Sequence, residues 1–422
     1  MNISSVMFYE LFVVLYSLHF HGSSLIEEEH QIWYFFTTAT LLFLAITFFD
    51  TFKSLQNFIS FGVLFACIRF MRSWNNSGQK YSSQYNIAYY LSHSNPNLMW
   101  GLIILTYFVL TLCIYIQGSL VPTFAFSFGK RLPDVKDPGG LISFIVVFVA
   151  TSVSFSFKLL QYYIDGNTIP KWLNRFLLWI IESHHIDLSS ATLEDNELKF
   201  QLQSVSIQLS KFTTIILLLL VISRVIIGKI RKIRYGTITD ITNIMTIYLI
   251  HQTRQENIPI FLTNRIDQYI LTVAMTVLCL QNLTFFCMGN TNSLATVDLS
   301  NAYNGVKAYN VFLVGLLTFV SNFAGPIFWS LSGLQLLYEP SLLNFNGPAT
   351  TDLLHYTGLK KSILLVKSLI SLFFYTVSAV NLVGSCINLR FHLFIWTVFS
   401  PKLLFFGSWI LFVNVLIDLF WQ

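Results

Sequence analysis

Three adjacent carboxylates and a histidine, Glu27, Glu28, Glu29 and His30, precede a long apolar run in the stretch "GSSLIEEEHQIWYFF". Ser24 and Glu27 have capping-box spacing, and acids in a first helical turn are stabilised by the helix dipole. Carboxylates beside a histidine at a membrane surface also suit an ammonium group or a metal ion. Because consecutive helical residues point about 100° apart, all three cannot face one ligand. Helix capping is the leading interpretation, and a ligand-facing role for at least one acid is the second.

A second cluster, "RSWNNSGQKY", places cations and amides directly after an apolar segment. The residues of this cluster that could bind a ligand are Arg72, Asn75, Gln79 and Lys80. Anchoring at the lipid head groups is the favoured interpretation, whereas a phosphate or a sugar hydroxyl would suit the same side chains. Asn75 also begins an Asn-Asn-Ser glycosylation triplet.

The third cluster is the amide-rich stretch "GNTNSLATVDLSNAYNGVKAYN" between two strongly apolar segments. Asn and Asp cap turns, which accounts for much of this composition, and a binding role is an equal alternative. The residues that we select as possible substrate contacts are Asn292, Asp298, Asn301, Tyr303 and Asn304.

The fourth cluster, "LRFHLFIWTVFSPKLLF", sets Arg390, His392 and Lys402 around an aromatic patch. Pro401 breaks or starts a helix there. We interpret the stretch as an elbow at the membrane surface that enters a final span. A lone histidine such as His392 is more often a satisfied interfacial residue than a catalytic one.

The elements that must position these clusters are membrane helices. Of the 422 residues, 54% are hydrophobic and 11% are charged, far below the roughly 25% of soluble domains. Spans of about 20 apolar residues are expected at 5–20, 32–49, 55–71, 98–117, 141–163, 212–228, 267–287, 309–337, 362–388 and 402–420, with a doubtful short one at 237–250. The sequence therefore predicts an all-α polytopic bundle of about ten or eleven transmembrane helices.

The connections between these spans are too short for a soluble domain, so a single multi-spanning membrane domain is expected over residues 1–422. The longest interruption, 164–211, predicts two interfacial, amphipathic helices around a polar turn. Cysteines all fall within predicted spans and lack CxxC spacing, which favours buried apolar roles over metal ligands. His184, His185 and Asp187 form a short-loop cluster that is a poor chelator, so no metal site is expected.

Basic loops orient the chain. Lysines and arginines in "GKIRKIRYG" and "GKRLPDVKDPGG" mark the cytosolic side. Counting spans from either loop puts the acidic cluster and the Asn75 loop on the lumenal side. Beyond Gly236 the orientation depends on the doubtful span, and it stays open.

Together these four motifs resemble the C-terminal membrane region of the glycosylphosphatidylinositol (GPI) ethanolamine-phosphate transferases. The acidic stretch is most similar to transferase 2, the branch that acts on the second mannose of the anchor. The resemblance extends from about Phe20 to near the C-terminus.

The resemblance implies a multi-pass protein of the endoplasmic reticulum membrane in GPI-anchor assembly. In that family, ethanolamine phosphate moves from phosphatidylethanolamine to a mannose hydroxyl. The reaction takes place in a lumenal, phosphatase-like domain with a threonine nucleophile and a two-metal zinc site. A small hydrophobic stabilising subunit usually accompanies its members.

This chain carries no segment that matches the lumenal catalytic domain, since it lacks a GDHG-like metal motif and any strand–helix alternation. We therefore expect no catalytic residues and no cofactor in this chain, which alone should be inactive and should support the missing domain. The alternative is a polytopic transporter or receptor, which would use the ionisable residues Glu10, Arg224, Lys367 and Asp418. Most of these lie near predicted span ends, where snorkelling explains them.

Overall fold

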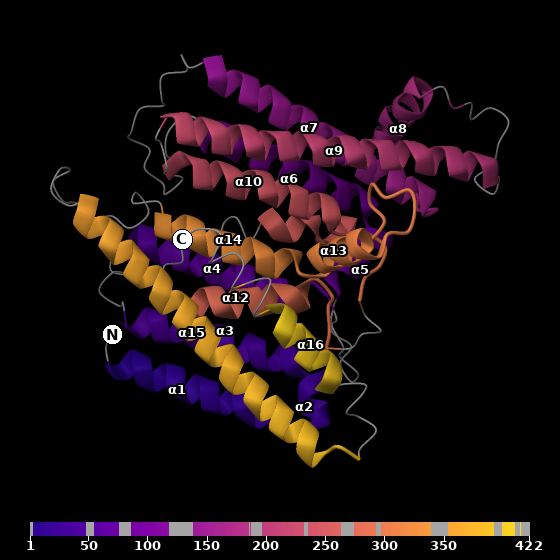
Figure 1. The fold of residues 1–422 in the computed structure, drawn as a ribbon. Coiled ribbons are helices and arrows are strands. Elements are labelled where there is room, and N and C mark those ends of the chain that lie inside the picture. The colour runs from indigo at the N-terminus through magenta and orange to yellow at the C-terminus, as the bar shows by residue number, and fades with distance from the viewer. Residues whose placement is uncertain are drawn as a thin grey trace. The chain divides into compact units, whose positions relative to one another are not determined.

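The computed structural model describes residues 3–47, 55–75, 86–117, 138–184, 186, 196–231, 235–262, 274–292, 297–338, 353–391, 399–409 and 414. The helices in chain order are α1 (Ile3–Leu18), η1 (His19–His21), α2 (Ser23–Glu27), α3 (Glu29–Thr47), α4 (Leu55–Arg72), α5 (Ile87–His93), α6 (Pro96–Gln117), α7 (Pro138–Ile164), α8 (Lys171–Ser183), α9 (Asn196–Arg231), α10 (Tyr235–Gln252), η3 (Gln255–Asn257), α12 (Ala274–Cys287), α13 (Val311–Asn322), α14 (Ala324–Tyr338), α15 (Leu353–Asn388) and α16 (Ser400–Ser408). No strand occurs among these residues, which confirms the all-α prediction (Figure 1).

The chain divides into two compact units. Unit 1 comprises Met1–Asn86, Ile266–Val297 and Gly325–Gln422, and unit 2 comprises Ile87–Arg265 and Asp298–Ala324. Each unit is therefore built from stretches that are not contiguous in the sequence.

In unit 1, α12 packs against α3, α4 and α15, while α1 packs against α15. Aromatic rings fill the space between α1, α3 and α15: the Tyr16 ring lies 5.1 Å from Trp33 and 4.9 Å from Phe374. All three side chains are buried. Large buried aromatics contribute much of the burial energy of such a core, and here they surround the start of α3.

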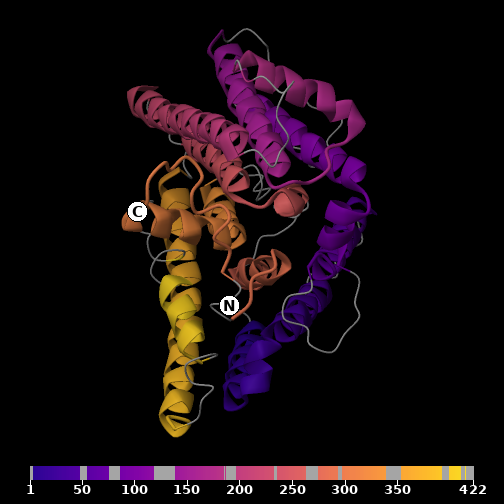
Figure 2. The same cartoon turned by 90° about the vertical axis from the view of Figure 1, so that its right-hand side faces the viewer.

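In unit 2, α9 packs along α7 and α10, and α6 packs against α7 and α10. Figure 2 shows α9 and α10, both in rose, side by side. The apolar core cluster between α7, α9 and α10 consists of Val147, Ala150, Leu217, Leu220, Ile244 and Ile247. The two residues from each helix are three positions apart, so they lie on the same face of that helix and point into the cluster.

The structure confirms fewer spans than the sequence predicts. Within the described residues, three helical stretches are long and apolar enough to cross a membrane, namely Ile145–Ile164, Glu197–Ser223 and Ser368–Asn388. Two bent helix pairs raise this number to five if each pair is one span. A count of ten or eleven is thus not confirmed, although the helical membrane architecture is.

The predicted span at 309–337 is occupied by two helices with a break between them. Its two parts, α13 and α14, meet at Phe323 with a bend of 72°. Ala324, Gly325 and Pro326 follow the break directly. Because proline lacks a backbone N–H and disfavours the helical conformation of the residue before it, this sequence permits the sharp change of direction.

The segment 164–211, predicted to hold two interfacial helices, contains α8 and the first turns of α9. The amphipathic helix α8 buries Leu173, Leu177 and Ile180 and exposes Trp172 and Trp179. The second predicted helix, however, is the beginning of α9, which runs unbroken for 36 residues. The sequence contains no proline or glycine between Asn196 and Ile227 that would end a helix, so the polar first turns continue into the apolar ones.

The doubtful segment 237–250 lies within α10, which packs among the helices of unit 2. Ile244, Ile247 and Ile250 on α10 are buried.

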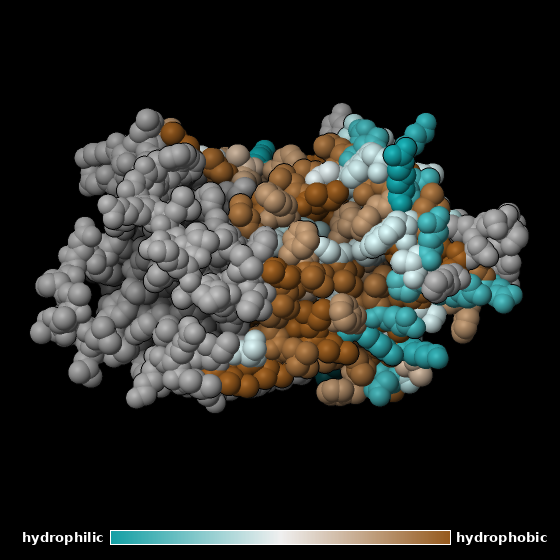
Figure 3. Space-filling view, turned by 90° about the horizontal axis from the view of Figure 1, so that it is seen from above, coloured by the Kyte–Doolittle hydropathy of each residue, from teal (hydrophilic) through white to brown (hydrophobic). Residues whose placement is uncertain are grey.

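On the face in Figure 3, hydrophobic side chains occupy the middle, and hydrophilic ones gather at the right-hand end, where Figure 1 places α8 and the first turns of α9. The apolar middle is suited to lipid and the polar end to water.

Candidate functional site

The first polar site lies in unit 1 around Glu29, the first residue of α3, whose side chain is completely buried. Glu29 Oε1 accepts hydrogen bonds from Tyr16 Oη at 2.6 Å and Trp33 Nε1 at 2.8 Å. Its Oε2 accepts from Asn292 Nδ2 at 2.7 Å and lies 2.5 Å from Lys402 Nζ. The carboxylate therefore has four donors and leaves no oxygen for an additional ligand.

Lys402 reaches this carboxylate from the first turn of α16, directly after Pro401 at the helix start. Its ammonium group also donates to Asn292 Oδ1 at 3.3 Å and lies 4.6 Å from the ring centroid of Phe406. The Lys402 side chain is only 6% exposed. A buried ion pair is tolerated only when geometry and further hydrogen bonds offset the desolvation of both charges, and Asn292 supplies such bonds to both partners.

A histidine borders the same site. His19 in η1 is buried, and its Nδ1 contacts the backbone oxygen of Tyr16. Its Nε2 lies 3.9 Å from Glu29 Oε2 and has no hydrogen-bond partner among the described residues. The pair Glu29–Lys402 thus has an imidazole nitrogen as a neighbour.

The remaining members of the acidic cluster do not share this site. Glu27 is the last residue of α2, Glu28 lies between two helices, and only Glu29 begins α3, so the predicted common first turn is wrong. The chain turns between α2 and α3, which separates the acids. Glu28 is 35% exposed and lies 3.5 Å from His30 Nε2, while His30 itself is buried.

Two residues of the second cluster are held by contacts within unit 1. Arg72 at the end of α4 donates to Gln31 Oε1 at 3.3 Å and covers the Tyr34 ring at 5.3 Å. Asn75 Nδ2 donates to the backbone oxygen of Cys287 at 2.6 Å. Packing within the protein therefore accounts for both residues at least as well as head-group anchoring does.

Several predicted positions lie outside the described residues or side chains. These positions are Gln79, Lys80, His185, Asp187, Arg224, Lys367, His392 and Asp418. Arg390 is exposed and lies 4.9 Å from the ring centroid of Phe391, whereas Lys402 is buried.

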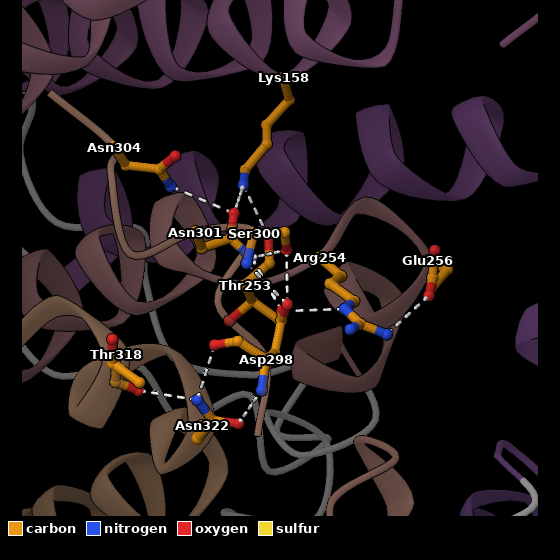
Figure 4. A network of polar contacts seen from close by, with 10 residues as sticks. All are labelled: Lys158, Thr253, Arg254, Glu256, Asp298, Ser300, Asn301, Asn304, Thr318 and Asn322. Carbon is orange, nitrogen blue, oxygen red and sulfur yellow. Dashed lines mark hydrogen bonds and ion pairs between the residues drawn. The ribbon is translucent and has the colours of Figure 1, made fainter. Parts of the chain in front are cut away.

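The second polar site lies in unit 2 around Asp298 (Figure 4). Asp298 Oδ1 accepts hydrogen bonds from the backbone N–H and the hydroxyl of Ser300, at 2.9 and 2.6 Å. Its Oδ2 accepts from Arg254 Nε at 2.8 Å and from Asn301 Nδ2 at 3.3 Å. Asn322, the last residue of α13, bonds both the N–H and the backbone oxygen of Asp298 at 3.0 Å.

A buried lysine connects α7 to this loop. Lys158 is completely buried, and its Nζ donates to the backbone oxygen of Thr253 at 2.7 Å and to Asn301 Oδ1 at 3.3 Å. Asn304 Nδ2 donates to the same oxygen at 3.1 Å and to Gln252 Oε1 at 3.2 Å. No carboxylate of the described residues lies within 4 Å of the Lys158 ammonium. Ionisable groups at such positions in membrane proteins are costly and frequently functional.

The charged groups around Asp298 shift one another's pKa values. Burial alone would raise the pKa of Asp298, but hydrogen bonds from Arg254 and Ser300 outweigh it, and the net pKa is lowered. The hydrogen bond to Asp298 raises the pKa of Arg254. Burial raises the pKa of Glu256, against the opposing effect of Arg254. At neutral pH, Asp298 and Arg254 are therefore a fixed pair of opposite charges.

A chain of hydroxyls and an imidazole crosses the same unit. His251 Nδ1 lies 3.0 Å from Ser154 Oγ, and His251 Nε2 lies 2.9 Å from Ser210 Oγ. Ser154 Oγ is also 2.9 Å from Tyr107 Oη. Four helices, α6, α7, α9 and α10, are thereby connected through buried polar contacts.

Sequence reasoning found part of each site. Glu29, Asn292 and Lys402 do meet in unit 1, and Asp298, Asn301 and Asn304 meet in unit 2, whereas Tyr303 is 49% exposed and makes none of these bonds. The residues that it missed are Tyr16, His19, Trp33, Lys158, His251, Gln252 and Arg254. The signal for Lys158 was present, since it is a lone cation within an apolar segment predicted to span.

Metal-binding groups do not cluster in the part of the chain that the structure describes. No set of three or more His, Cys, Asp or Glu side chains there is arranged to hold a metal ion. The four cysteines described, Cys67, Cys279, Cys287 and Cys386, are free thiols.

Similarity to known proteins extends over nearly the whole chain. Residues 1–422 match a family described as "GPI ethanolamine phosphate transferase membrane region". The protein "GPI ethanolamine phosphate transferase 2" of Candida albicans is 96% identical over 99% of this chain and 49% of its own length. Its namesakes in Debaryomyces hansenii and Saccharomyces cerevisiae are 48% and 31% identical over 96% and 92% of this chain, and over 47% and 43% of their own lengths. The chain thus spans about half the length of the curated relatives it matches. No solved structure matches it.

Proposed function

Because this chain belongs to the GPI ethanolamine phosphate transferase family, as its membrane region, we propose that it supports transfer of ethanolamine phosphate to a GPI precursor. The donor is phosphatidylethanolamine and the acceptor is a hydroxyl of the second mannose. The observation that carries the proposal is the match of the entire chain to the membrane region of transferase 2. The transporter or receptor alternative receives no support from these relatives.

Catalysis itself belongs to a domain outside this chain in the proposal. The Glu29 carboxylate is saturated by four donors, and the described residues hold no metal-binding cluster. A lumenal, phosphatase-like domain with a zinc site would supply the nucleophile and clamp the attacking and leaving oxygens. The membrane region would receive the two lipid substrates at its lumenal surface, in the endoplasmic reticulum membrane, with a small hydrophobic subunit as its partner.

The two polar sites serve different purposes in this scheme. The Glu29, Asn292 and Lys402 cluster is closed to ligands and holds α3 to α16. The Asp298 loop carries partly exposed charges, with Asp298 at 13% and Arg254 at 46%, and is the better candidate for a lipid head group. Exposed or half-buried members of the predicted set, Glu27, Glu28 and Tyr303, would lie at the water boundary.

A complementation experiment tests the proposal. Cells that lack the related transferase would receive either a full-length protein with this membrane region or the 422-residue chain alone. Mass spectrometry of GPI intermediates should show ethanolamine phosphate on the second mannose only with the full-length protein. Restoration by the chain alone, or none by a correctly inserted full-length protein, would contradict it.

A charge reversal separates the roles of the acids. In the full-length protein, Glu28→Lys should reduce transfer without reducing membrane insertion, because the Glu28 side chain, which lies 3.5 Å from His30 Nε2 and is 35% exposed, would meet an ammonium group or a basic surface. Glu28→Gln, which removes charge at constant size, serves as the matched variant. Unchanged transfer in both variants would show that Glu28 has no role in binding the substrates.

A further inference from the structure

The guanidinium of Arg254 is anchored on one side and open on the other. Its Nε donates to Asp298 Oδ2 at 2.8 Å, and its Nη1 lies 4.0 Å from Glu256 Oε1. The Nη2 group has no partner among the described residues, and the side chain is 46% exposed. Because a guanidinium carries five N–H donors in a rigid fork, the edge formed by the two Nη groups remains able to bind an anion.

The anchoring side fixes the direction of that edge. Asp298 is itself held by Ser300 and by Asn322, and Asn322 also donates to the backbone oxygen of Thr318 at 2.9 Å (Figure 4). Every oxygen of the Asp298 carboxylate is thus engaged within the loop. A group that is held in its binding orientation loses little conformational entropy when a ligand arrives.

A negative charge accompanies this open cationic edge. Glu256 in η3 follows Arg254 closely in the chain, and its side chain is 29% exposed. Figure 4 shows the Arg254 and Glu256 side chains directed toward each other. The surface therefore presents a half-exposed guanidinium beside a carboxylate that is partly buried and partly accessible to water.

The surroundings favour a lipid head group over a soluble anion. Helix α5 packs against η3, and its Tyr89 and Tyr90 are 60% and 52% exposed. Tyrosines with an apolar ring and a polar tip are enriched where a membrane meets water. A simple anion would also meet repulsion from Glu256, whereas a ligand that carries an ammonium group beside its phosphate would offset that repulsion.

We propose that Arg254 and Glu256 form a binding site for the zwitterionic ethanolamine phosphate group, with Arg254 on the phosphate and Glu256 on the ammonium. Asp298 is a positioning residue that orients Arg254. This inference rests on the function proposed above and assigns residues of unit 2 to the head group.

Binding to lipids tests the site without catalysis. The 422-residue chain, purified in nanodiscs, would be titrated with phosphatidylethanolamine, and bound lipid would be counted by native mass spectrometry. Arg254→Gln should weaken binding at least tenfold. Lys307→Gln removes a positive charge from an exposed position of the same loop and should bind like the wild type.

A comparison of two lipids tests the role of the Glu256 carboxylate. Phosphatidylglycerol shares the phosphodiester but lacks the ammonium, so the wild type should prefer phosphatidylethanolamine over it. Glu256→Gln should abolish this preference while phosphate-dependent binding persists. Soluble phosphorylethanolamine should displace the lipid, and inorganic phosphate should displace it less well. This comparison distinguishes recognition of the whole head group from recognition of phosphate alone.

Three results would overturn the inference: equal binding by folded Arg254→Gln and wild type, no preference between the two lipids, or no displacement by phosphorylethanolamine. Size-exclusion profiles and the conservative Arg254→Lys variant report whether a loss of binding reflects misfolding. If Arg254→Gln binds normally but the full-length protein still restores GPI modification, the site is wrong and the proposed function stands.

Discussion

The carboxylate of Glu29 and the ammonium of Lys402 lie 2.5 Å apart in the buried core of unit 1, although they come from opposite ends of the chain. Each also bonds Asn292, which donates to the acid and accepts from the base. Three of the four polar clusters in the sequence therefore meet at one point. Because neither charge reaches water, each depends on the other for its solvation.

Removal of one charge from this pair should destabilise the protein strongly. Lys402→Met leaves a buried carboxylate without its cation, which costs about 3–5 kcal/mol when such a pair is broken. Glu29→Gln should cost a similar amount. Melting temperatures from fluorescence-detected size-exclusion chromatography in detergent measure both losses.

A double variant isolates the coupling. Glu29→Gln with Lys402→Met removes both charges, so its loss should be smaller than the sum of the two single losses. Glu28→Gln is the matched control, since Glu28 is 35% exposed and its loss should stay within about 0.5 kcal/mol. Additive losses would show that the pair does not stabilise unit 1 as a pair.

Gly325 should not tolerate a side chain. A Cβ at this position would lie 2.8 Å from the Cβ and Oγ1 atoms of Thr284 on α12. Gly325→Ala should therefore lower stability by about 1–3 kcal/mol through overpacking. Gly315 in α13 has no atom within 4 Å of such a Cβ, and Gly315→Ala should raise stability by up to about 1 kcal/mol. Thermal unfolding of both variants gives the comparison, and a stable Gly325→Ala would contradict the close approach.

Acid should weaken unit 2 through Asp298. Since the folded state lowers the pKa of Asp298, its stabilisation is full above the unfolded value of about 3.9 and is lost as the pH falls through the lower folded value. Asp298→Asn should be less stable than wild type at neutral pH by about 1–3 kcal/mol, and the difference should shrink below about pH 4. Glu256, whose pKa is raised, acts in the opposite sense, so the comparison belongs in a Glu256→Gln background. A difference that is independent of pH would refute the assignment.

Lys158 should hold the 297–310 loop on the helices of unit 2. Lys158→Met removes the donor to Thr253 O and one of the two donors to Asn301 Oδ1, the other being Asn304 Nδ2. Hydrogen–deuterium exchange in the loop should therefore increase at least severalfold while α9 is unchanged. Lys171→Met at the exposed start of α8 should have no such effect. Unchanged exchange in the loop would show that Asn322 and Ser300 suffice to order it.

Much of the helical framework was predictable, because apolar runs of about 20 residues have few alternatives to a helix in a membrane. The predicted helix boundaries differ from those of the structure at the start of α9 and at Phe323. A polar first half did not stop α9, because no residue before Gly228 ends a helix there. The bend at Phe323 does have a local signal, since Gly325 and Pro326 follow it directly, but the prediction of one span at 309–337 did not use it.

The two polar sites were less predictable than the helices, since the residues that meet in each site are distant in sequence. Composition marks Glu29 as one of three acids, but only tertiary packing decides that this acid is buried and that Glu28 is not. Tyr16 and Trp33 look like ordinary aromatics of a span, and nothing local indicates that both donate to the same carboxylate. Arg254 follows α10, and the sequence left open whether the segment 237–250 within that helix is a span.

The discontinuity of the two units has a consequence for biosynthesis. Unit 2 is complete once residue 324 has been translated, whereas unit 1 still awaits its last segment. The ribosome therefore delivers Glu29 to the translocon long before Lys402 exists, and the nascent acid must stay hydrated, protonated or bound by a chaperone in the meantime. A premature stop codon after residue 324 would leave that acid without its counter-ion. The truncated chain would contain all of unit 2 but would lack the last segment of unit 1.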